Sequence, residues 1–326
     1  MTLLLTHSEI VGLLTMPEVI DLVETAHRDL ALGRSDQPVP ATVTPPGFTS
    51  LFVPMVAASA EVVCVKVLSD VPDNPGRALP AQQSVVVVVN PETGVVDALL
   101  PGAAITLLRT AAASAVATRH LARAGSRVLG LIGAGAQAHT HLDALRQVRD
   151  VDQVLVWSRS RTSAERFAER HAGPDLRVQV CDNPEVVVRS ADIVCTLTPS
   201  LTPIVKGAWF HPGLHINAVG APPRPTHREV DGEGMYRARV VVDSLPVALD
   251  TSGEVLLALA EGAIRPEHVG TELGQVIVGS ATGREHDSDV TLFDSVGVAI
   301  QDASVAAHIV KLARARGAGT VVDLAA

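Results

Sequence analysis

A glycine-rich turn, Gly133-Ala134-Gly135-Ala136-Gln137-Ala138, is the clearest motif for chemistry in this sequence. It follows a short apolar run at residues 128–132, typical of a buried parallel strand, and precedes a segment with helical spacing of apolar residues. A strand, a G-x-G-x-x-A turn and a helix together bind a dinucleotide pyrophosphate at a helix N-terminus. Gly133 permits the tight turn, Gly135 lets the backbone approach the phosphates, and Ala138 lets the helix pack closely. An ordinary βα turn is the alternative, but the flanking elements favour a dinucleotide site.

The residues after the next apolar run, 154–157, bear on the choice of cofactor. An NAD enzyme usually carries Asp or Glu here, where the carboxylate accepts a hydrogen bond from the ribose 2′-hydroxyl. This sequence reads Ser158-Arg159-Ser160-Arg161, with two guanidinium groups and no carboxylate. Because the planar fork of Arg matches phosphate geometry, the loop favours NADP(H), with NAD(H) as the alternative. A solvated basic loop is the simpler explanation of the same residues.

Lys66 and Arg109 are two cations in apolar surroundings. Lys66 lies in the strand-like run 61–68, where alternation points its side chain to the side shared by Cys64 and Leu68. A lysine there must either extend to water or line a pocket. Arg109 lies in an alanine-rich helical segment, where its guanidinium could form a salt bridge or hold a carboxylate. The residues alone leave both interpretations of each cation open.

The first hundred residues predict two helices packed on a small, largely antiparallel sheet. Thr6 and Glu9 have the pattern of a capping box before one helix, and Pro17 opens a second. Strands are expected at residues 51–56, 61–68, 84–89 and 95–100. A further helix is expected from Thr106, as its N-cap, to Leu121.

Beyond residue 120 strands alternate with helices, which predicts a doubly wound parallel sheet of the Rossmann type. The carboxyl ends of its strands should surround the nicotinamide side of a crevice. These ends fall at Thr198, Val219-Gly220 and Asp243-Ser244. Later helices are expected near 253–261, 271–278 and 298–315. The predicted fold class is α/β, a Rossmann-type doubly wound sheet plus a smaller α+β domain.

Composition restricts the classes of function. The 326 residues carry 26 basic and 35 acidic side chains, a formal net charge of −9 and no basic block, which disfavours nucleic acid and anionic membranes as partners. Aromatic residues make up 2% of the chain, so no stacking platform for bases is evident. Cys64, Cys181 and Cys195 are scattered, as is typical of core residues in a reducing compartment. We therefore expect a cytoplasmic protein, and the scattered histidines suggest no metal site.

Several stretches along the chain form a common pattern. They are Arg109-Thr110-Ala111-Ala112-Ala113-Ser114-Ala115-Val116-Ala117-Thr118, the glycine turn with Trp157-Ser158-Arg159, Ile216-Asn217-Ala218-Val219-Gly220-Ala221, Asp243-Ser244, Ser252-Gly253-Glu254-Val255-Leu256, Glu272-Leu273-Gly274 and residues 293–297. This pattern resembles the signature of the ornithine cyclodeaminase/mu-crystallin family. The resemblance covers nearly the whole chain and is closer to the mu-crystallin branch, which includes NADPH-dependent ketimine reductases. Alanine dehydrogenases and other imino-acid reductases are further relatives.

The resemblance implies a domain organisation and a site. Residues 1–119 with 298–326 would form a discontinuous substrate-binding and dimerisation domain, and residues 120–297 the NAD(P)-binding Rossmann domain. A homodimer would form through the sheet of the first domain, and a substrate pocket would lie between the domains. Lys66 and Arg109 would face the nicotinamide there, and Arg109 would hold the substrate carboxylate. If apolar surroundings and Arg109 lower the pKa of Lys66, the lysine could donate a proton to the imine nitrogen or hold its charge.

Further site residues follow from the same resemblance. Val296 would join Lys66 and Arg109 in binding substrate. Gln83 is a weaker candidate, because it comes just before the apolar run 85–89 and most glutamines are simply exposed. Cofactor contacts would come from Arg109, Thr110, Gly133, Gly135, Ala136, Gln137, Ser158, Arg159, Ser160, Thr198, Val219, Gly220 and Ser295.

The sequence departs from the family pattern at two places. Cyclodeaminases carry an Asp shortly after the stretch matched by Val219-Gly220-Ala221, where this chain has Pro222-Pro223. Proline offers no proton-transfer group, which disfavours ornithine cyclisation. A first carboxylate-binding Arg is expected near residues 37–42, which read Gln-Pro-Val-Pro-Ala-Thr. Arg77 could replace it, although an exposed loop Arg is the simpler interpretation.

The predicted function is reduction of an imino acid, a ketimine or cyclic imine carboxylate, to an amino acid with NAD(P)H. An alanine-type amino-acid dehydrogenase, or a cyclodeaminase, is the alternative enzyme. A protein that binds NADPH or another ligand with little turnover is the alternative from another class. The expected partners are the small substrate and a second copy of the chain.

Overall fold

Two structural units divide the chain, and the first is discontinuous. It consists of Met1–Arg109 and the segment that starts at Gly297, whereas Thr110–Val296 form the second. The computed structural model describes residues 1–324. The division falls inside helix α3 (Gly102–Leu121), earlier in the chain than the boundary expected after residue 119.

The first unit contains a mixed sheet. Among the described residues its strands follow the order β15-β1-β6-β5-β4-β3-β2, and the pairs are antiparallel except β1 with β6. The strands are β1 (Thr2–Leu4), β2 (Ser35–Asp36), β3 (Leu51–Ser59), β4 (Val63–Asp70), β5 (Gln82–Val89), β6 (Val96–Pro101) and β15 (Thr320–Val322). The largely antiparallel sheet is confirmed. The short strands β1, β2 and β15 are additions that the sequence did not reveal, and β2 and β15 form the two edges.

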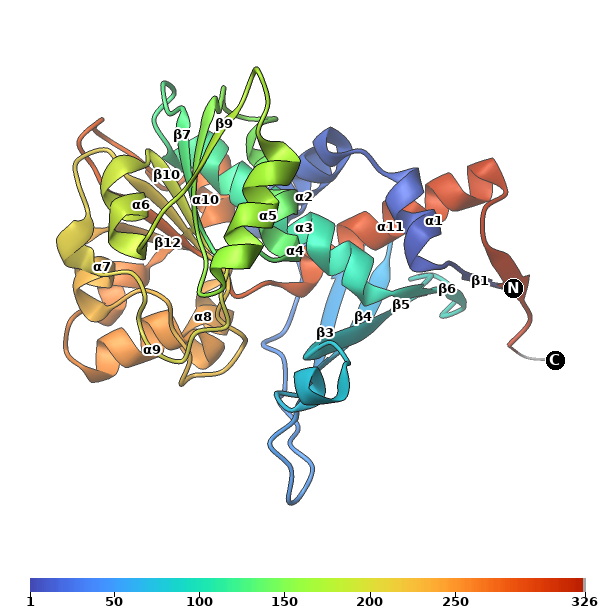
Figure 1. Cartoon of the computed structure of the whole chain (residues 1–326). Coiled ribbons are helices and arrows are strands. Elements are labelled where there is room, and N and C mark those ends of the chain that lie inside the picture. The colour runs from blue at the N-terminus through green and yellow to red at the C-terminus, as the bar shows by residue number, and fades with distance from the viewer. Residues whose placement is uncertain (325–326) are drawn as a thin grey trace. The chain divides into compact units, whose positions relative to one another are not determined.

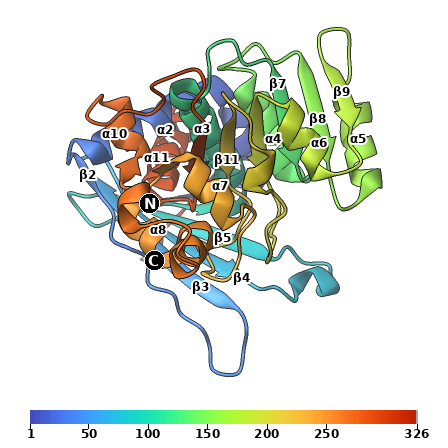
Figure 2. The same cartoon turned by 90° about the vertical axis from the view of Figure 1, so that its left-hand side faces the viewer.

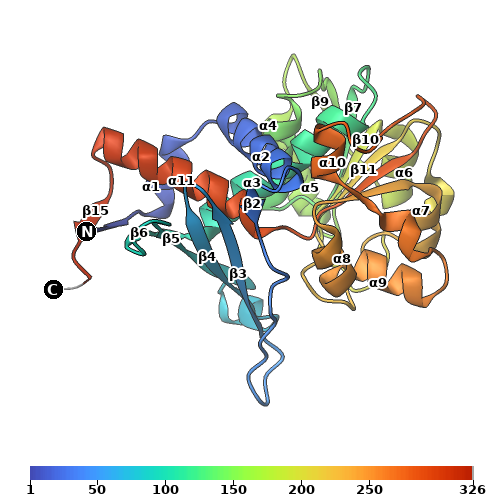
Figure 3. The same cartoon turned by 180° about the vertical axis from the view of Figure 1, so that it is seen from behind.

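Helices cover one face of this sheet. They are α1 (His7–Leu13), α2 (Met16–Ala31), the start of α3 and α11 (Ala299–Arg316), with a short 3₁₀ turn η1 (Asn74–Arg77) in a loop. Figure 3 shows the red α11 lying across the strands beside α2. The capping box of Thr6 and Glu9 is confirmed. The N-cap at Thr106 is wrong, because α3 begins at Gly102 and places Thr106 inside the helix.

The second unit is built on a parallel sheet. Its described strands follow the order β13-β12-β14-β11-β10-β7-β8-β9, and all pairs are parallel. The strands are β7 (Val128–Ile132), β8 (Gln153–Trp157), β9 (Arg177–Val180), β10 (Ile193–Thr196), β11 (His215–Ala218), β12 (Arg239–Val242), β13 (Thr271–Glu272) and β14 (Thr291–Asp294). Figure 2 shows β7, β8 and β9 side by side. Chain order reverses between β7 and β10, the switch point at which α/β sheets bind ligands, so the Rossmann prediction is confirmed.

Helices of the second unit flank these strands. They are α4 (Ala136–Leu145), α5 (Arg161–His171), α6 (Pro184–Ser190), α7 (Gly232–Arg237), α8 (Leu245–Thr251), α9 (Gly253–Ala260) and α10 (Leu273–Ile277), with 3₁₀ turns η2 (Gly207–Trp209) and η3 (Pro266–Val269). Figure 1 shows α4, α5 and α6 beside the strands β7 to β10. The expected helix at 271–278 is wrong at its start, since Thr271–Glu272 form β13. Strand β14 was not foreseen.

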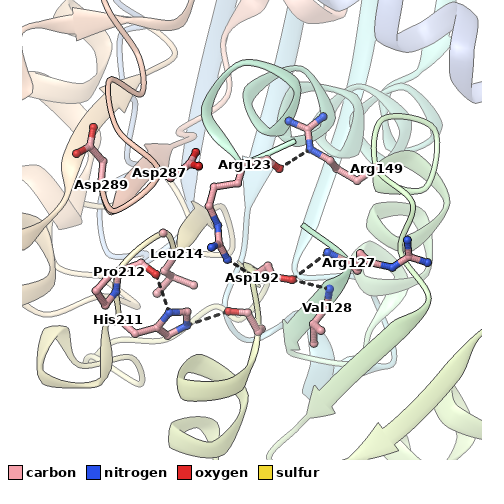
Figure 4. A network of polar contacts seen from close by, with 12 residues as sticks. Arg123, Arg127, Val128, Arg149, Asp192, His211, Pro212, Leu214, Asp287 and Asp289 are labelled. Carbon is pink, nitrogen blue, oxygen red and sulfur yellow. Dashed lines mark hydrogen bonds and ion pairs between the residues drawn. The ribbon is translucent and has the colours of Figure 1, made fainter. Parts of the chain in front are cut away.

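One carboxylate joins the starts of the two central strands. Asp192 precedes β10, and its Oδ2 accepts hydrogen bonds from the backbone N–H groups of Arg127 (2.9 Å) and Val128 (3.0 Å) at the start of β7. Its Oδ1 pairs with Arg123 at 2.7 Å, and Arg149 donates to the Arg123 carbonyl, as Figure 4 shows. This network fixes the amino-terminal end of the sheet, opposite the glycine turn.

Two further observations bear on the expectations from composition. Cys64, Cys181 and Cys195 are buried free thiols, as expected of core residues. Within residues 1–324 the structure contains no helix that combines the length and the apolar character needed to cross a membrane.

Candidate active site

Lys66 lies at the centre of a buried polar cluster in the first unit. Strand alternation places it on the buried face of β4 with Cys64, and only 1% of its surface is exposed. Its Nζ donates a hydrogen bond of 2.9 Å to Asp302 Oδ1 and one of 2.6 Å to Thr106 Oγ1. Asp302 comes from the first turn of α11 and Thr106 from α3. The lysine therefore does not extend to water, and it is paired with Asp302 inside the unit.

Arg109 belongs to the same cluster. Its Nε lies 3.5 Å from Asp302 Oδ1, and its Nη1 donates to Gln301 Oε1 at 3.0 Å. The Gln301 amide therefore directs its Nε2 to His27 Nε2, 3.0 Å away, so His27 must accept there and is the neutral Nδ1–H tautomer. Gly297 packs against the guanidinium, because a Cβ on it would lie 2.7 Å from Nη1. These contacts fix the guanidinium fork in one orientation.

Burial sets the protonation equilibria of the cluster. Desolvation lowers the pKa of Lys66 to about 8, opposed by the charge of Asp302 and assisted by that of Arg109. Burial alone would raise the pKa of Asp302, but Arg109 and Lys66 outweigh this effect and hold it below the usual range. Burial, with the nearby Arg109, lowers the pKa of His27 to about 4. The lysine can therefore gain or lose a proton near neutral pH while Asp302 stays ionised.

The charge of the cluster is unbalanced. Lys66 and Arg109 contribute two positive charges and Asp302 one negative charge, while His27 is neutral. Arg109 Nε and Asp302 Oδ2 are buried without a hydrogen-bond partner. Since uncompensated buried charge is costly, this arrangement is suited to a ligand that brings a carboxylate.

The glycine turn of the second unit has the geometry of a dinucleotide cradle. Gly133 has φ +116°, and a Cβ there would lie 2.9 Å from the Leu197 carbonyl oxygen, so the tight turn requires glycine. A Cβ on Gly135 would meet nothing within 4 Å, which leaves open space at the first turn of α4. Gly135 is the N-cap of α4 and no side chain caps this end. These residues fit a dinucleotide pyrophosphate at the free N–H groups of α4.

The two arginines after β8 differ in their environment. Arg161 is held by Glu165 at 2.9 Å and by Asp182 at 3.0 Å. Arg159 is exposed and forms no hydrogen bond or ion pair with another residue of the part of the chain that the structure describes. Ser160 is occupied as the N-cap of α5. Arg159 is thus the guanidinium that is available to a ligand.

The other predicted site residues are placed as follows. Thr198 and Gly220 lie just after β10 and β11, where their backbone N–H groups bind Glu229. Ser295 follows β14 and donates its N–H to Ala218 at 2.9 Å. Thr110 is a buried residue of α3 at the start of the second unit, and Val296 ends that unit.

Gln83 is not brought to the Lys66 cluster. Strand β5 pairs with β4 so that Lys66 lies opposite Val86 and Ser69 opposite Gln83. Because alternate residues point to opposite faces, Gln83 lies on the face away from Lys66 and Gln82 on the same face. Arg77 is exposed at the end of η1.

The segment that lacks the expected Arg has a structural role. Gln37 Oε1 accepts a hydrogen bond of 3.1 Å from the N–H of Ile300, in the first turn of α11. It thereby fixes the start of the helix that carries Gln301 and Asp302. Sequence reasoning missed these two residues and His27, because a carboxylate in the first turn of a helix is ordinary.

Comparison with known proteins decides the family. The family model described as "Ornithine cyclodeaminase/mu-crystallin family" matches residues 1–317. The chain belongs to the ornithine cyclodeaminase/mu-crystallin family. The assignment made from the motifs is thereby confirmed.

This ornithine cyclodeaminase/mu-crystallin family member has relatives with named activities. It is 38% identical to the ketimine reductase mu-crystallin of Mus musculus over 258 residues. The matched region covers 79% of this chain and 78% of the relative. A structure of Thermococcus litoralis Δ1-pyrroline-2-carboxylate reductase in complex with NADH and L-proline is 34% identical, with a TM-score of 0.93, and covers 98% of this chain and 100% of that chain. A structure of an archaeal alanine dehydrogenase dimer with bound NAD is 34% identical, with a TM-score of 0.94, and covers 99% of both chains.

Proposed function

We propose that this protein reduces an imino acid, a ketimine or cyclic imine carboxylate, to an amino acid, with Lys66 as the proton donor and Arg109 as the carboxylate clamp. The chain is an NAD(P)H-dependent oxidoreductase of C–N bonds, like its relatives named for reduction of pyrroline-2-carboxylate and of ketimines. The observation that supports the two roles is the buried cluster of two cations around the single carboxylate of Asp302.

The cluster suits both ends of an imino acid. The fork of Arg109, oriented by Gln301, would hold the substrate carboxylate in a fixed geometry for reaction. The pKa of Lys66, lowered by burial to about 8, makes it an efficient acid near neutral pH. Asp302 would keep a proton on the lysine in the free enzyme.

The reaction needs one hydride and one proton. When bound, the nicotinamide supplies the hydride that adds to the imine carbon. The π electrons of the C=N bond then become a lone pair on nitrogen, which takes the proton from Lys66 Nζ. Lys66 is left as a neutral amine, which its buried surroundings favour over the charged form. Thr106 Oγ1 remains beside Nζ to hold the amine in place.

The same residues support the reverse reaction, oxidative deamination of an amino acid. A neutral Lys66 would accept the proton in that direction, so deamination is favoured above pH 8. The loop after Gly220 carries Pro222-Pro223 in place of the cyclodeaminase Asp, which argues against cyclisation of ornithine.

For the cofactor we favour NADP(H). Arg159 is exposed beyond β8 and pairs with no described residue, so its fork is available for a 2′-phosphate. No carboxylate stands at Ser158-Arg159-Ser160 to accept from a ribose 2′-hydroxyl.

We also propose a homodimer through the uncovered face of the first unit's sheet. Most residues of β3, β4 and β5 that point away from Lys66 are apolar: Phe52, Pro54, Val56, Val63, Val65, Val67, Val85, Val87 and Val89. Ser69 and Gln83, paired with each other toward one end of these strands, are polar residues of the same face. Val67 is 39% and Val85 43% exposed. The side chains on a solvated face of an antiparallel sheet are normally polar. A contiguous patch of apolar side chains on such a face therefore marks an interface.

The test is a matched pair of lysine variants assayed with Δ1-pyrroline-2-carboxylate and related imino acids. Lys66→Met should lower kcat/KM by about 10²–10⁴-fold and leave the Kd for NADPH unchanged. Lys311→Met, at an exposed position of α11, should behave like the wild type. Wild-type turnover in Lys66→Met would remove the proposed acid. Stabilisation of the wild type by NADPH without oxidation of NADPH by any imino acid would instead favour a binding protein.

A further inference from the structure

Glu229 is a buried carboxylate in the second unit that no catalytic role accounts for. Its surface is 0% exposed, and it lies between β11 and β12 in the chain. Its own carbonyl accepts backbone hydrogen bonds from Ile204 at 2.8 Å and Val205 at 2.9 Å. Its N–H donates to Glu254 Oε1 at 2.8 Å. Hydrogen bonds to its carbonyl and from its N–H therefore fix the backbone of Glu229, in addition to the contacts of its side chain.

Both carboxylate oxygens are fully used. Oε1 accepts from the N–H and from the Oγ1 hydroxyl of Thr198, each at 2.7 Å. Oε2 accepts from Thr196 Oγ1 and from the Gly220 N–H, each also at 2.7 Å. Charge-assisted hydrogen bonds of this length are strong, and two of the four donors are backbone groups.

The donors come from the carboxyl ends of two neighbouring strands. Thr196 ends β10, Thr198 follows it, and Gly220 follows β11. The two segments are in direct contact, since a Cβ on Gly220 would lie 2.1 Å from the Thr198 backbone nitrogen. Such strand ends next to the switch point form the ligand crevice of a doubly wound sheet.

We infer that Glu229 is a positioning residue of the dinucleotide site, which holds the strand ends after β10 and β11 at the separation that the nicotinamide half of the cofactor requires. This inference rests on the proposed cofactor binding. Glu229 is fully buried, so it would act through Thr198 and Gly220, to which it is hydrogen-bonded. A glutamine in its place would replace one of the two carboxylate oxygens with an NH₂ group. That NH₂ group cannot accept a hydrogen bond from the two donors that faced the oxygen.

The test compares Glu229→Gln with Glu233→Gln, an exposed glutamate of α7, in calorimetric titrations with NAD⁺. NAD⁺ is chosen because it has no phosphate group that titrates near pH 6. Glu229→Gln should raise the Kd about tenfold, since unpaired buried donors cost that much or more. Glu233→Gln should leave the Kd at the wild-type value. An unchanged Kd in folded Glu229→Gln overturns the inference, whereas failure of the wild type to bind any dinucleotide overturns the proposed function itself.

A pH series distinguishes positioning from general stability and needs no variant that folds poorly. Burial raises the pKa of Glu229 to about 6, although its hydrogen bonds to Thr196, Thr198 and Gly220 lower it. The ionised form is the one that accepts all four bonds. The affinity of the wild type for NAD⁺ should therefore fall about threefold from pH 7.5 to 5.5. A flat wild-type profile overturns the inference.

Neighbouring groups also titrate, and the variant separates them. Glu254 and Asp294 are buried carboxyl groups with raised pKa values, and the Cys195 thiol lies in the field of Glu229. All three remain in Glu229→Gln. Any part of the pH dependence of NAD⁺ affinity that is lost in this variant is therefore due to titration of Glu229. The same dependence of affinity on pH in variant and wild type would count against the inference.

Discussion

Replacing Asp302 with Asn tests the electrostatic argument most directly. Asparagine keeps the shape of the side chain and an oxygen that can accept from Lys66 Nζ, but removes the negative charge. Lys66 and Arg109 would then be two buried cations without a counter-ion. The pKa of Lys66 must fall, because the ionised carboxylate is the group that raises it against burial and Arg109.

The size of the shift follows from the geometry. Two unit charges separated by the 2.9 Å between Nζ and Oδ1 interact by about 6 kcal/mol at an effective dielectric constant of ~20. Solvent and the remaining dipole of Asn recover part of this energy. Even about a quarter of it, roughly 1.4 kcal/mol, lowers the pKa by about one unit. We therefore expect the pKa of Lys66 to fall from about 8 to about 7 or below.

The assay is the pH dependence of kcat/KM for imine reduction, which reports groups of the free enzyme and of the substrate. Reduction needs protonated Lys66, so the rate falls as pH rises through its pKa. At pH 8 the Asp302→Asn variant should be about fivefold slower than the wild type, relative to each protein's rate at pH 6. The substrate contributes the same ionisation to both profiles, so the difference belongs to the enzyme.

The reverse reaction provides a second readout. Oxidative deamination needs neutral Lys66, so the acidic limb of its profile should move to lower pH by the same amount in Asp302→Asn. Coincident limbs for wild type and variant in both directions would refute the electrostatic coupling of Asp302 to Lys66. A shift in one direction of reaction alone would refute the assignment of the limb to Lys66.

Two further outcomes are expected. Arg159→Ser should raise the Kd for NADPH about tenfold in fluorescence titrations and leave the Kd for NADH unchanged, because it removes the guanidinium that would bind the 2′-phosphate. Arg161→Ser is the control. An equal loss of affinity for both cofactors in Arg159→Ser would contradict the NADP(H) preference. Val67→Lys should convert a dimer to a monomer in light scattering, because it places a charge on the apolar sheet face, whereas Val11→Lys on α1 should not. A dimer that persists in Val67→Lys would exclude that face as the interface.

Local patterns predicted the elements that depend on neighbouring residues. The glycine turn was readable because a tight turn with positive φ at Gly133 has a specific sequence signature. The side to which Lys66 points was readable because strand residues alternate. The face of Gln83 depends on the register of β5 against β4, which pairs Val86 with Lys66, and a shift of one residue would reverse it.

Long-range contacts could not be read in this way. Asp302 lies 236 residues from Lys66, and its position in the first turn of a helix has a sufficient local explanation. Strand β14 has four residues and no alternation, so nothing in the segment distinguishes it from a loop. Helix α3 begins at Gly102, although glycine is a weak helix former. Glycine is needed at this position because a Cβ would lie 2.2 Å from Ser84 Oγ, a contact with a distant strand that the local sequence does not show.

The discontinuity of the first unit has a consequence for synthesis on the ribosome. Strand β1 is made first, but its antiparallel neighbour β15 is made last, and Lys66 emerges 236 residues before Asp302. At about 5–20 residues per second, the lysine waits about 10–50 s for its counter-ion. The whole of Thr110–Val296 is translated in that interval. The nucleotide-binding unit can therefore mature while the unit that carries the proton donor is still an incomplete chain.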